Sequence, residues 1–483
     1  MVVGGSPEGA RPHLDVPPRL MASTESLTTL AAELATADDL ELLQGAADLQ
    51  RYSKDAYDYS PILQPQLESC RADLVVRPLT VAGVERLAAA CGRHGVPLTL
   101  RGSGTGNYGQ SVPLEGGVVM LSGALREVEH LDPSTGVVMV QPGCLMRDLD
   151  QHLRAHGRQL RLLPSTWRSA SIGGFLAGGS GGIGSIRWGF LRDPGHLLGA
   201  ELITVEREPR RLQLDATEAE ALNHAYGTNG ILTRLQLATA PAVNWHQISI
   251  DVETWGAAVA LLQRCTRSAV ELHLATLLER SVLQCLPAWS GPESDRHRLL
   301  LLVAPDGVST LARLAAASGA VLHDLGPEDL GGGQGLRDLS WNHTTLHKRS
   351  EDAGWTYLQM LLPEPELPAM EQLKQRWGDA LLWHLEGVRQ QGAARLAALP
   401  LVRWSSTEQL DALMRDCREV GAVLFNPHVI TVEDGGLGVV DGDQVAAKHR
   451  YDPEGLLNPG KLRGWLESIS SPGCPGSPHL SRG

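Results

Sequence analysis

The amino-acid sequence predicts an α+β fold made of two or three globular units. A chain of 483 residues, 42% of them apolar, can bury more than one hydrophobic core. Helical and strand-like patterns alternate along it, and residues 242–352 repeat the order strand, helix, strand, which indicates a mixed sheet with helices on one face. No internal sequence repeat is clear enough to use.

Charge and cysteine content narrow the class of protein. The formal net charge of −13 and the lack of any Lys/Arg cluster argue against a nucleic-acid binder, so we expect a small-molecule substrate. The seven cysteines are scattered without a C-x-x-C pair, which argues against a zinc knuckle or a redox dithiol. The sequence contains neither a secretory pattern at its start nor a run of apolar residues long enough for a transmembrane segment. We therefore expect a cytoplasmic protein.

Closely spaced elements are predicted for the first half of the chain. Residues 1–21 are expected to be a flexible leader, and 22–68 an N-terminal segment. A helix is predicted from Val81, with Thr80 as its cap and Gly95 at its end, and the strand "VPLTL" follows it. The sequence "DPSTG" predicts a hairpin turn, and "MRDLDQHLRAHG" predicts a second helix.

A first glycine-rich segment, Arg101–Gln110, follows the strand "VPLTL". It contains the pattern G-x-G-x-x-G at Gly104, Gly106 and Gly109. A doubly wound dinucleotide fold would need a helix to begin there, because the helix N-terminus holds the pyrophosphate. Here Pro113 and two further glycines precede another strand, so the doubly wound fold is disfavoured.

A second glycine-rich segment, Ser165–Gly189, has the same composition and is too long for a simple turn. Loops of this kind can bind a pyrophosphate by turning backbone N–H groups inward, with hydroxyl and amide side chains as further donors. Near the C-terminus "GLLNPGKL" almost matches a nucleotide-triphosphate loop, but Leu462 stands where Ser or Thr would hold magnesium, so we reject that interpretation. We predict that the two glycine-rich segments together bind a dinucleotide.

The order of these motifs resembles a known family. From "VVRPLTVAGVERLAAACGRHGVPLTLRGSGTG" through "SASIGGFLAGGSGGIGS" to "YGTNGILTRLQL", about residues 69–241, the chain is similar to the FAD-binding domain of the vanillyl-alcohol oxidase and p-cresol methylhydroxylase (PCMH) superfamily. The closing "YDPEGLLNPGKL" resembles the end of its FAD-linked oxidase branch, which includes the flavin-binding polypeptide of glycolate oxidase and the D-lactate dehydrogenases.

The resemblance implies a domain organisation. It places a PCMH-type FAD-binding domain of two subdomains at 69–241 and an α+β, ferredoxin-like cap or substrate domain at 242–430. A C-terminal FAD-linked oxidase segment at 431–467 would return to the FAD-binding domain, and 468–483 would be a disordered tail.

The resemblance also implies which residues bind FAD. They are Arg101, Gly102, Ser103, Gly104, Thr105, Gly106, Asn107, Tyr108 and Gly109 in the first segment, Thr166, Ser171, Ile172, Gly173, Gly174, Gly178, Gly181 and Ser185 in the second, and Ile231, Asn458 and Lys461 elsewhere. Members that link FAD covalently often carry a His in the first segment or a Cys in the second. Neither occurs here, so we expect non-covalent FAD.

An alcohol-oxidising flavin site needs a base close to the flavin, and histidine titrates in the useful range. The sequence "WNHTTLHKRS" places His343 and His347 four residues apart, and "NPHVITVEDGG" adds His428 and Glu433. We predict these four as catalytic residues.

Neighbouring residues extend the prediction. Lys348 and Arg349 offer an anchor for an anion, and Tyr52, Tyr57 and Tyr59 are candidates to border the flavin. Hydroxy-acid dehydrogenases of this branch carry an H-x-x-G-D-G-N-x-H type motif for a divalent metal. The corresponding region here reads "FNPHVITVEDGG", so no metal is predicted.

Together these observations predict an FAD-dependent dehydrogenase or oxidase that acts on a CH–OH group, such as that of a hydroxy acid. The electron acceptor is left open among oxygen, a quinone and a cytochrome. Two alternatives remain: a nicotinamide-dependent FAD reductase of the same fold, and a flavin-binding protein without turnover.

Overall fold

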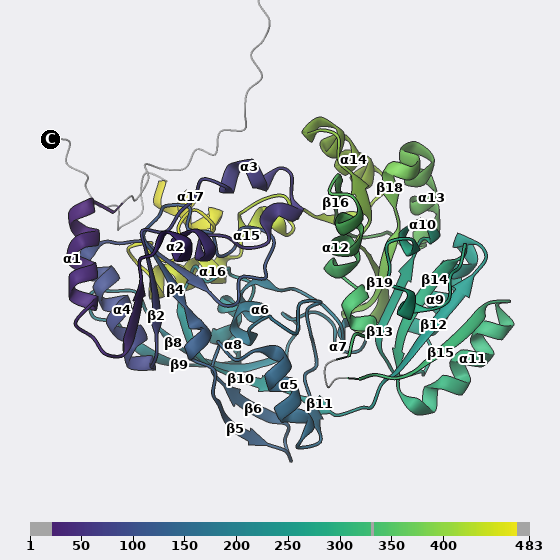
Figure 1. Cartoon of the computed structure of the whole chain (residues 1–483), viewed down its shortest axis with the longest axis horizontal. Helices are drawn as coiled ribbons and strands as arrows, with labels where there is room; N and C mark the ends of the chain where they lie inside the picture. The colour runs from purple at the N-terminus through teal and green to yellow at the C-terminus, as the bar shows by residue number, and fades with distance from the viewer. Residues whose placement is uncertain (1–21, 330–332, 471–483) are drawn as a thin grey trace, which may run out of the picture.

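The computed structural model describes residues 22–329 and 333–470, so the predicted leader and all but the first three residues of the predicted tail lie outside the described residues. It confirms the α+β class. One part of the molecule holds the elements up to β11 together with the C-terminal helices, and the other is built around one large sheet (Figure 1).

The first sheet has four strands in the order β1-β2-β4-β3, of which β2, β4 and β3 run parallel. Their bounds are β1 (Leu40–Leu43), β2 (Leu74–Pro78), β3 (Leu98–Arg101) and β4 (Val118–Leu121). Helix α4 (Val81–His94) packs on this sheet and against α1 (Thr24–Leu34). As predicted, the Thr80 hydroxyl accepts the Gly83 N–H at 3.0 Å, and Gly95 ends α4 at φ +62°.

The second sheet has five antiparallel strands in the order β5-β6-β10-β8-β9. Their bounds are β5 (Val128–Asp132), β6 (Val137–Val140), β8 (Leu197–Ile203), β9 (Arg211–Asp215) and β10 (Ile231–Ala238). The predicted hairpin joins β5 to β6, and its turn is held by Asp132, whose carboxylate accepts the N–H groups of Ser134 and Thr135. The predicted helix after it is α5 (Met146–Arg154).

The second part contains a repeat that the sequence did not reveal. Its eight-stranded sheet has the order β15-β12-β14-β13-β19-β20-β17-β22, which is two βαββαβ units, each with the spatial order 4-1-3-2, joined edge to edge through β13 and β19. The first unit is β12 (His246–Val252), α9 (Trp255–Thr266), β13 (Leu272–Leu278), β14 (His297–Val303), α11 (Val308–Ala317) and β15 (Val321–Pro327). The second is β17 (Gln359–Leu361), α13 (Glu366–Trp377), β19 (His384–Gln390), β20 (Ala393–Ala398), α14 (Thr407–Glu419) and β22 (Val423–Phe425). All four helices share one apolar core with the sheet.

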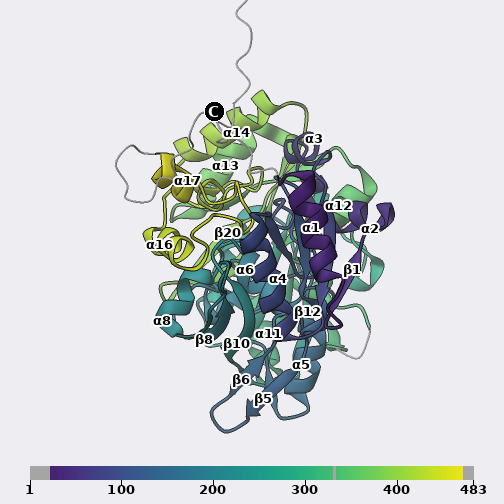
Figure 2. The same cartoon turned by 90° about the vertical axis from the view of Figure 1, so that its left-hand side faces the viewer.

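The C-terminal segment returns to the first sheet. Leu98 of β3 donates its N–H to Leu456 and accepts that of Asn458, both at 2.8 Å, so the segment extends the sheet edge. Both side chains of the Lys448–Asp452 ion pair are buried, and the pair stabilises the turn that leads from residue 452 into this segment. Helices α16 (Gly442–Tyr451) and α17 (Arg463–Ser470) therefore lie at the end of the molecule that holds the first sheet (Figures 1 and 2).

The remaining elements include a two-stranded sheet of β7 and β11 and a three-stranded sheet in the order β16-β21-β18. They are α2 (Ala46–Tyr52), α3 (Leu63–Leu67), β7 (Arg158–Gln159), α6 (Ile172–Gly178), α7 (Ser185–Trp188), α8 (Ala216–Ala219), β11 (Ala240–Pro241), α10 (Arg280–Leu283), α12 (Asn342–Glu351), β16 (Trp355–Tyr357), β18 (Leu381–Leu382), β21 (Leu401–Arg403) and α15 (Val432–Gly435). One apolar cluster crosses between the two parts and includes Trp167, Trp245 and Leu274, so the parts meet along a packed seam.

Candidate functional site

The two glycine-rich segments face each other across a cavity of about 630 Å³. The first contributes residues 101–108 with Gln110 and Ser111, and the second contributes twelve residues between 165 and 181. Most of the residues that the two segments contribute are glycine, serine or threonine, which is the lining that a loop-bound phosphate group needs.

The two segments approach so closely that a side chain would fill the space between them. A Cβ atom on Gly102 would collide with the Ser171 hydroxyl and lie 3.4 Å from the Gly174 Cα atom. Gly104 has a left-handed backbone at φ +71°, and a Cβ atom there would collide with the Arg101 guanidinium. This narrow cradle fits an extended dinucleotide whose pyrophosphate lies against backbone N–H groups.

The second segment contains helices as well as loops. The Ser171 hydroxyl accepts the Gly174 N–H at 3.3 Å and caps the short helix α6. The segment ends in α7, where Gly184 donates its N–H to the carbonyl of His273 in β13 at 2.8 Å. The second segment is therefore tied at its end to the large sheet.

Gln110 links the two segments and was not among the predicted binding residues. Its Oε1 accepts the Tyr108 N–H at 3.2 Å, and its Nε2 donates to the carbonyl of Gly178 at 3.4 Å. Sequence reasoning missed it because its role depends on the spacing of two segments that are far apart in the chain. The only signal was its position at the end of the first segment.

Most of the predicted FAD-binding residues line this cavity. They are Arg101, Gly102, Ser103, Gly104, Thr105, Gly106, Asn107, Tyr108, Thr166, Ser171, Gly173, Gly174, Gly178, Gly181 and Ile231. Five do not line it, namely Gly109, Ile172, Ser185, Asn458 and Lys461.

These five residues belong to the two glycine-rich segments or pack against them, outside the cavity. Ser185 is fully buried and its hydroxyl accepts the Gly182 N–H, while Ile172 packs in the core and Gly109 faces Leu67. The other two brace the end of the first segment, as the next contacts show.

Asn458 and Lys461 reach the first segment from the C-terminal end of the chain. The Asn458 Nδ2 and the Lys461 Nζ each donate to the carbonyl of Gln110 at 2.8 Å. Burial lowers the pKa of Lys461 and raises that of Asp55, and their mutual attraction opposes both shifts. These two residues therefore brace the first segment and do not line the cavity, and their predicted role in FAD binding stays a prediction.

The cavity continues to residues of the large sheet and of α12. Trp341, Asn342, His343 and Leu346 enter it from the start of α12, and Gln359 enters from β17. Tyr59 from the N-terminal segment closes the same end. His343 is therefore the one predicted catalytic residue that the structure places at the cavity.

The side chain of His347 does not reach the cavity. Its Nε2 atom lies 3.2 Å from the carbonyl oxygen of Asp338, and it does not line the cavity. Lys348 pairs with Glu351, and Arg349 donates to the backbone carbonyls of Asp58, Ala353 and Trp355. Neither Lys348 nor Arg349 lines the cavity, so their role as an anion anchor stays a prediction.

His428 is buried and connects two segments of the chain through its ring nitrogens. Its Nδ1 lies 2.8 Å from the Ser60 hydroxyl and its Nε2 lies 2.9 Å from the Tyr357 carbonyl oxygen, so the neutral ring fits with Nε2 donating and Nδ1 accepting. Burial lowers the pKa of His428 to about 4. His428 therefore holds β16 to the N-terminal segment and does not line the cavity, and its catalytic role stays a prediction.

Glu433 is also outside the cavity. It is buried, and its carboxylate accepts the N–H groups of Arg463 at 3.0 Å and Gly464 at 2.7 Å. These are the first residues of α17, so Glu433 satisfies donors that have no partner within the helix. The loop composition around Glu433 predicted catalysis, but those polar groups serve the start of a helix.

Two side chains that sequence reasoning did not identify, Tyr357 and Gln359, lie beside the predicted residues Asn107 and Tyr108. Gln359 donates to the Tyr108 hydroxyl at 2.9 Å, and Asn107 donates to the Tyr357 hydroxyl at 2.7 Å. Burial raises the pKa of Tyr108. Tyr357 ends β16 and Gln359 begins β17, and these two strands belong to different sheets, so no local pattern in the sequence marked the pair.

Comparison with known proteins agrees with this geometry. Residues 72–209 match the family described as FAD binding domain. Glycolate oxidase subunit GlcD of Bacillus subtilis is 31% identical over 145 residues, 30% of this chain and 30% of that protein. The D-lactate dehydrogenase of Archaeoglobus fulgidus is 22% identical over 280 residues, 55% of this chain and 62% of that protein.

Among solved structures, alkyldihydroxyacetonephosphate synthase has the same fold, with a TM-score of 0.70 at 16% identity over 93% of this chain and 86% of that chain. The two curated relatives are matched over 30% and 62% of their own lengths. The cradle and these similarities define a flavoprotein whose cofactor is FAD. The family match covers residues 72–209, and the rest of the chain shares the fold of the solved structure.

Two negative findings concern only residues 22–329 and 333–470. No helix there is long and apolar enough to span a membrane. Within the same residues, no group of three or more His, Cys, Asp or Glu side chains is arranged to hold a metal ion.

Proposed function

We propose that this protein is an FAD-dependent oxidoreductase that removes a hydride from a CH–OH group. The observation that carries the proposal is the continuity of one cavity, which runs from the glycine cradle to His343, Asn342 and Gln359. A cofactor held by the cradle and a substrate at the α12 end would share this single space. The names of the relatives, a glycolate oxidase and a D-lactate dehydrogenase, support a hydroxy acid as the donor.

The cradle residues would hold FAD without a covalent bond. Backbone groups of Gly102–Gly106 would face the pyrophosphate, with Ser103 and Thr105 as further donors, and Ser171 and Gly174 would close the opposite side. When bound, FAD supplies the acceptor for the hydride.

His343 is the proposed proton acceptor. It is half-buried at the cavity, and burial lowers its pKa, so the ring is neutral and able to take a proton at neutral pH. The amides of Asn342 and Gln359 would orient the substrate hydroxyl or a second polar group.

The test begins with the visible absorption spectrum of the purified protein, repeated on the supernatant after acid precipitation. Flavin bands that move into the supernatant are expected for non-covalent FAD, whereas flavin that stays in the pellet would contradict the proposed linkage. The flavin is then mixed anaerobically with glycolate, D-lactate, D-2-hydroxyglutarate, uncharged alcohols and NADPH.

Bleaching of the flavin bands by a hydroxy acid or an alcohol is the expected result, and its loss in His343→Gln would place the base. Bleaching by NADPH alone would instead support the FAD reductase alternative. Bound FAD that no donor reduces would support a flavin-binding protein without turnover. Reoxidation by oxygen, a quinone or cytochrome c then identifies the acceptor.

A further inference from the structure

The cavity end of α12 begins at a strained backbone turn. Trp341, directly before the helix, has φ +52° and ψ −138°, a conformation that side-chain-bearing residues rarely adopt. Such strain persists only where the surroundings hold the backbone in place, and it is concentrated at functional sites. Trp341 and the next two residues, Asn342 and His343, all line the cavity.

A buried carboxylate holds this turn. The Glu386 side chain is 1% exposed, and its Oε1 accepts the Trp341 N–H at 2.7 Å. The same carboxylate accepts the Thr276 hydroxyl at 2.7 Å and the His384 Nε2–H at 2.8 Å. Glu386 and Thr276 face each other across the β19–β13 pairing, so the acceptor stands where the two units of the large sheet join.

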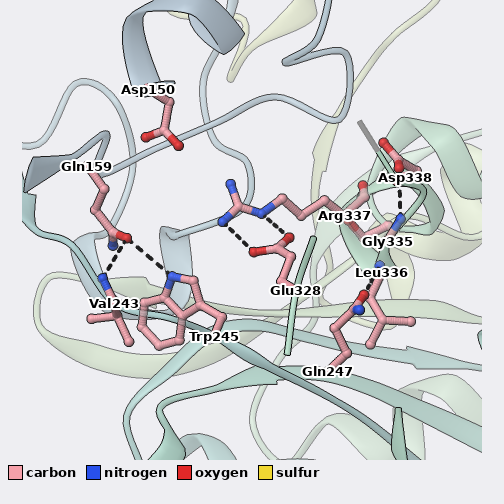
Figure 3. A network of polar contacts seen from close by, with 12 residues as sticks. Asp150, Gln159, Val243, Trp245, Gln247, Glu328, Gly335, Leu336, Arg337 and Asp338 are labelled. Carbon is pink, nitrogen blue, oxygen red and sulfur yellow. Dashed lines mark hydrogen bonds and ion pairs between the residues drawn. The ribbon is translucent and has the colours of Figure 1, made fainter. Parts of the chain in front are cut away.

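The chain that leads into the turn is fixed separately. Arg337 is buried and pairs with Glu328, and the N–H of Leu336 donates to the Gln247 side chain of β12 at 2.8 Å (Figure 3). The Gly335 N–H also donates to Asp338 at 3.0 Å (Figure 3). These contacts bring the chain to Trp341 along a defined path.

The FAD-binding part holds the same segment from the other side. Arg168 follows Trp167 in the second glycine-rich segment, and its guanidinium pairs with the Asp338 carboxylate at 3.2 Å. The Arg337 guanidinium lies 5.6 Å from the centre of the Trp167 ring. Beyond the turn, the Thr344 hydroxyl donates to the Leu339 carbonyl at 2.6 Å. Within this segment, the group that donates to Glu386 is the N–H of the strained residue Trp341.

We propose that Glu386 is a positioning residue that keeps the Trp341 turn in its strained form and thereby presents Asn342 and His343 to the substrate end of the cavity. This inference rests on the proposed function for its chemical consequence. If the carboxylate is removed, the Trp341 N–H loses its acceptor and the turn can relax toward an ordinary backbone conformation. His343 then moves relative to the substrate, although the FAD cradle on the other segments is unchanged.

The test compares three variants of the FAD-loaded protein. Glu386→Gln keeps an oxygen for the Trp341 N–H and is expected to reduce its flavin at close to the normal rate. Glu386→Met keeps the volume but offers no acceptor, and its limiting rate of flavin reduction is expected to fall roughly tenfold to hundredfold, as misplacement of a reacting group does.

Glu366→Met is the matched control. Glu366 is equally buried in the same part of the molecule and accepts a hydrogen bond from Gln263 at 2.7 Å, but it does not line the cavity. This variant is expected to lose stability while keeping the limiting rate. The proposal is overturned if Glu386→Met and Glu366→Met slow the reduction equally, or if Glu386→Gln is as slow as Glu386→Met.

Two readouts do not need a substrate. Hydrogen–deuterium exchange at residues 341–346 should rise in Glu386→Met and stay unchanged in Glu386→Gln and Glu366→Met, and the FAD dissociation constant should stay within about twofold in all three. If the unaltered protein oxidises no donor, the proposed function fails, but the exchange pattern still decides whether Glu386 holds the turn. Unchanged exchange in Glu386→Met would refute the positioning role independently.

Discussion

Substitution of Gly102 by Ala tests the close approach of the two glycine-rich segments. The added Cβ atom would collide with the Ser171 hydroxyl, which can rotate away only by releasing the Gly174 N–H that it caps. Loss of such a cap costs about 1 kcal/mol, and pushing the segments apart adds a cost of about 1 kcal/mol or more. We therefore expect Gly102→Ala to lower the free energy of unfolding by about 2 kcal/mol and to weaken FAD binding roughly tenfold or more.

The assay is urea unfolding at a fixed excess of FAD, together with an FAD titration followed by flavin fluorescence. Ser171→Ala removes the colliding hydroxyl, so Gly102→Ala should be milder in that background, and the two free-energy changes should sum to more than the double variant loses. Gly123→Ala is the control, because a Cβ atom there meets nothing within 4 Å. Strict additivity of Gly102→Ala and Ser171→Ala would refute the collision argument.

Three further predictions follow from the site. The rate of flavin reduction should be constant near neutral pH and fall as the pH drops below the lowered pKa of His343, because only the neutral ring accepts a proton. Stopped-flow measurements of flavin reduction from pH 5 to 8 test this. A rate that does not depend on pH would exclude His343 as the base. His428→Gln should retain FAD. The wild-type protein should lose stability as the pH falls from 6.5 to about 4, because the His428 ring binds a proton in the unfolded state and not when it is buried. The His428→Gln variant should lack this part of the pH dependence. Urea unfolding at several pH values measures the difference, and the same pH dependence in both proteins would contradict the prediction. Gly104→Arg should purify without flavin, because φ +71° and the Arg101 guanidinium leave no room for a side chain; full flavin content would show that this loop does not bind FAD.

Local signals in the sequence predicted local structure well. The cap at Thr80 and the glycine at Gly95 defined α4, and the turn chemistry of Asp132–Gly136 defined the β5–β6 hairpin. Both depend on contacts between residues close in sequence, so a single sequence carries enough information to place them. The two glycine-rich segments were found for the same reason.

Contacts between residues far apart in the chain could not be predicted from the sequence. The two βαββαβ units differ in sequence and in the lengths of their connections, so the repeat became visible only from strand order. His428 and Glu433 looked functional because polar residues clustered in loops, yet their partners, Ser60 and the start of α17, lie far away in the chain. A buried polar group needs a partner in any fold, and a polar cluster alone does not distinguish that need from catalysis.

Because the two units are joined edge to edge, the large sheet is one continuous hydrogen-bonded sheet, and we expect it to move as a rigid unit, called here the plate. Opening it at the middle would break the β13–β19 ladder and the Glu386 contacts that stand on it. Helix α7, the end of the second glycine-rich segment, packs against both of these strands, so any flexing of the plate would also disturb the cradle. A substrate is therefore expected to enter and leave through movements of loops at the rim of the cavity, while the plate and the cradle move as one body.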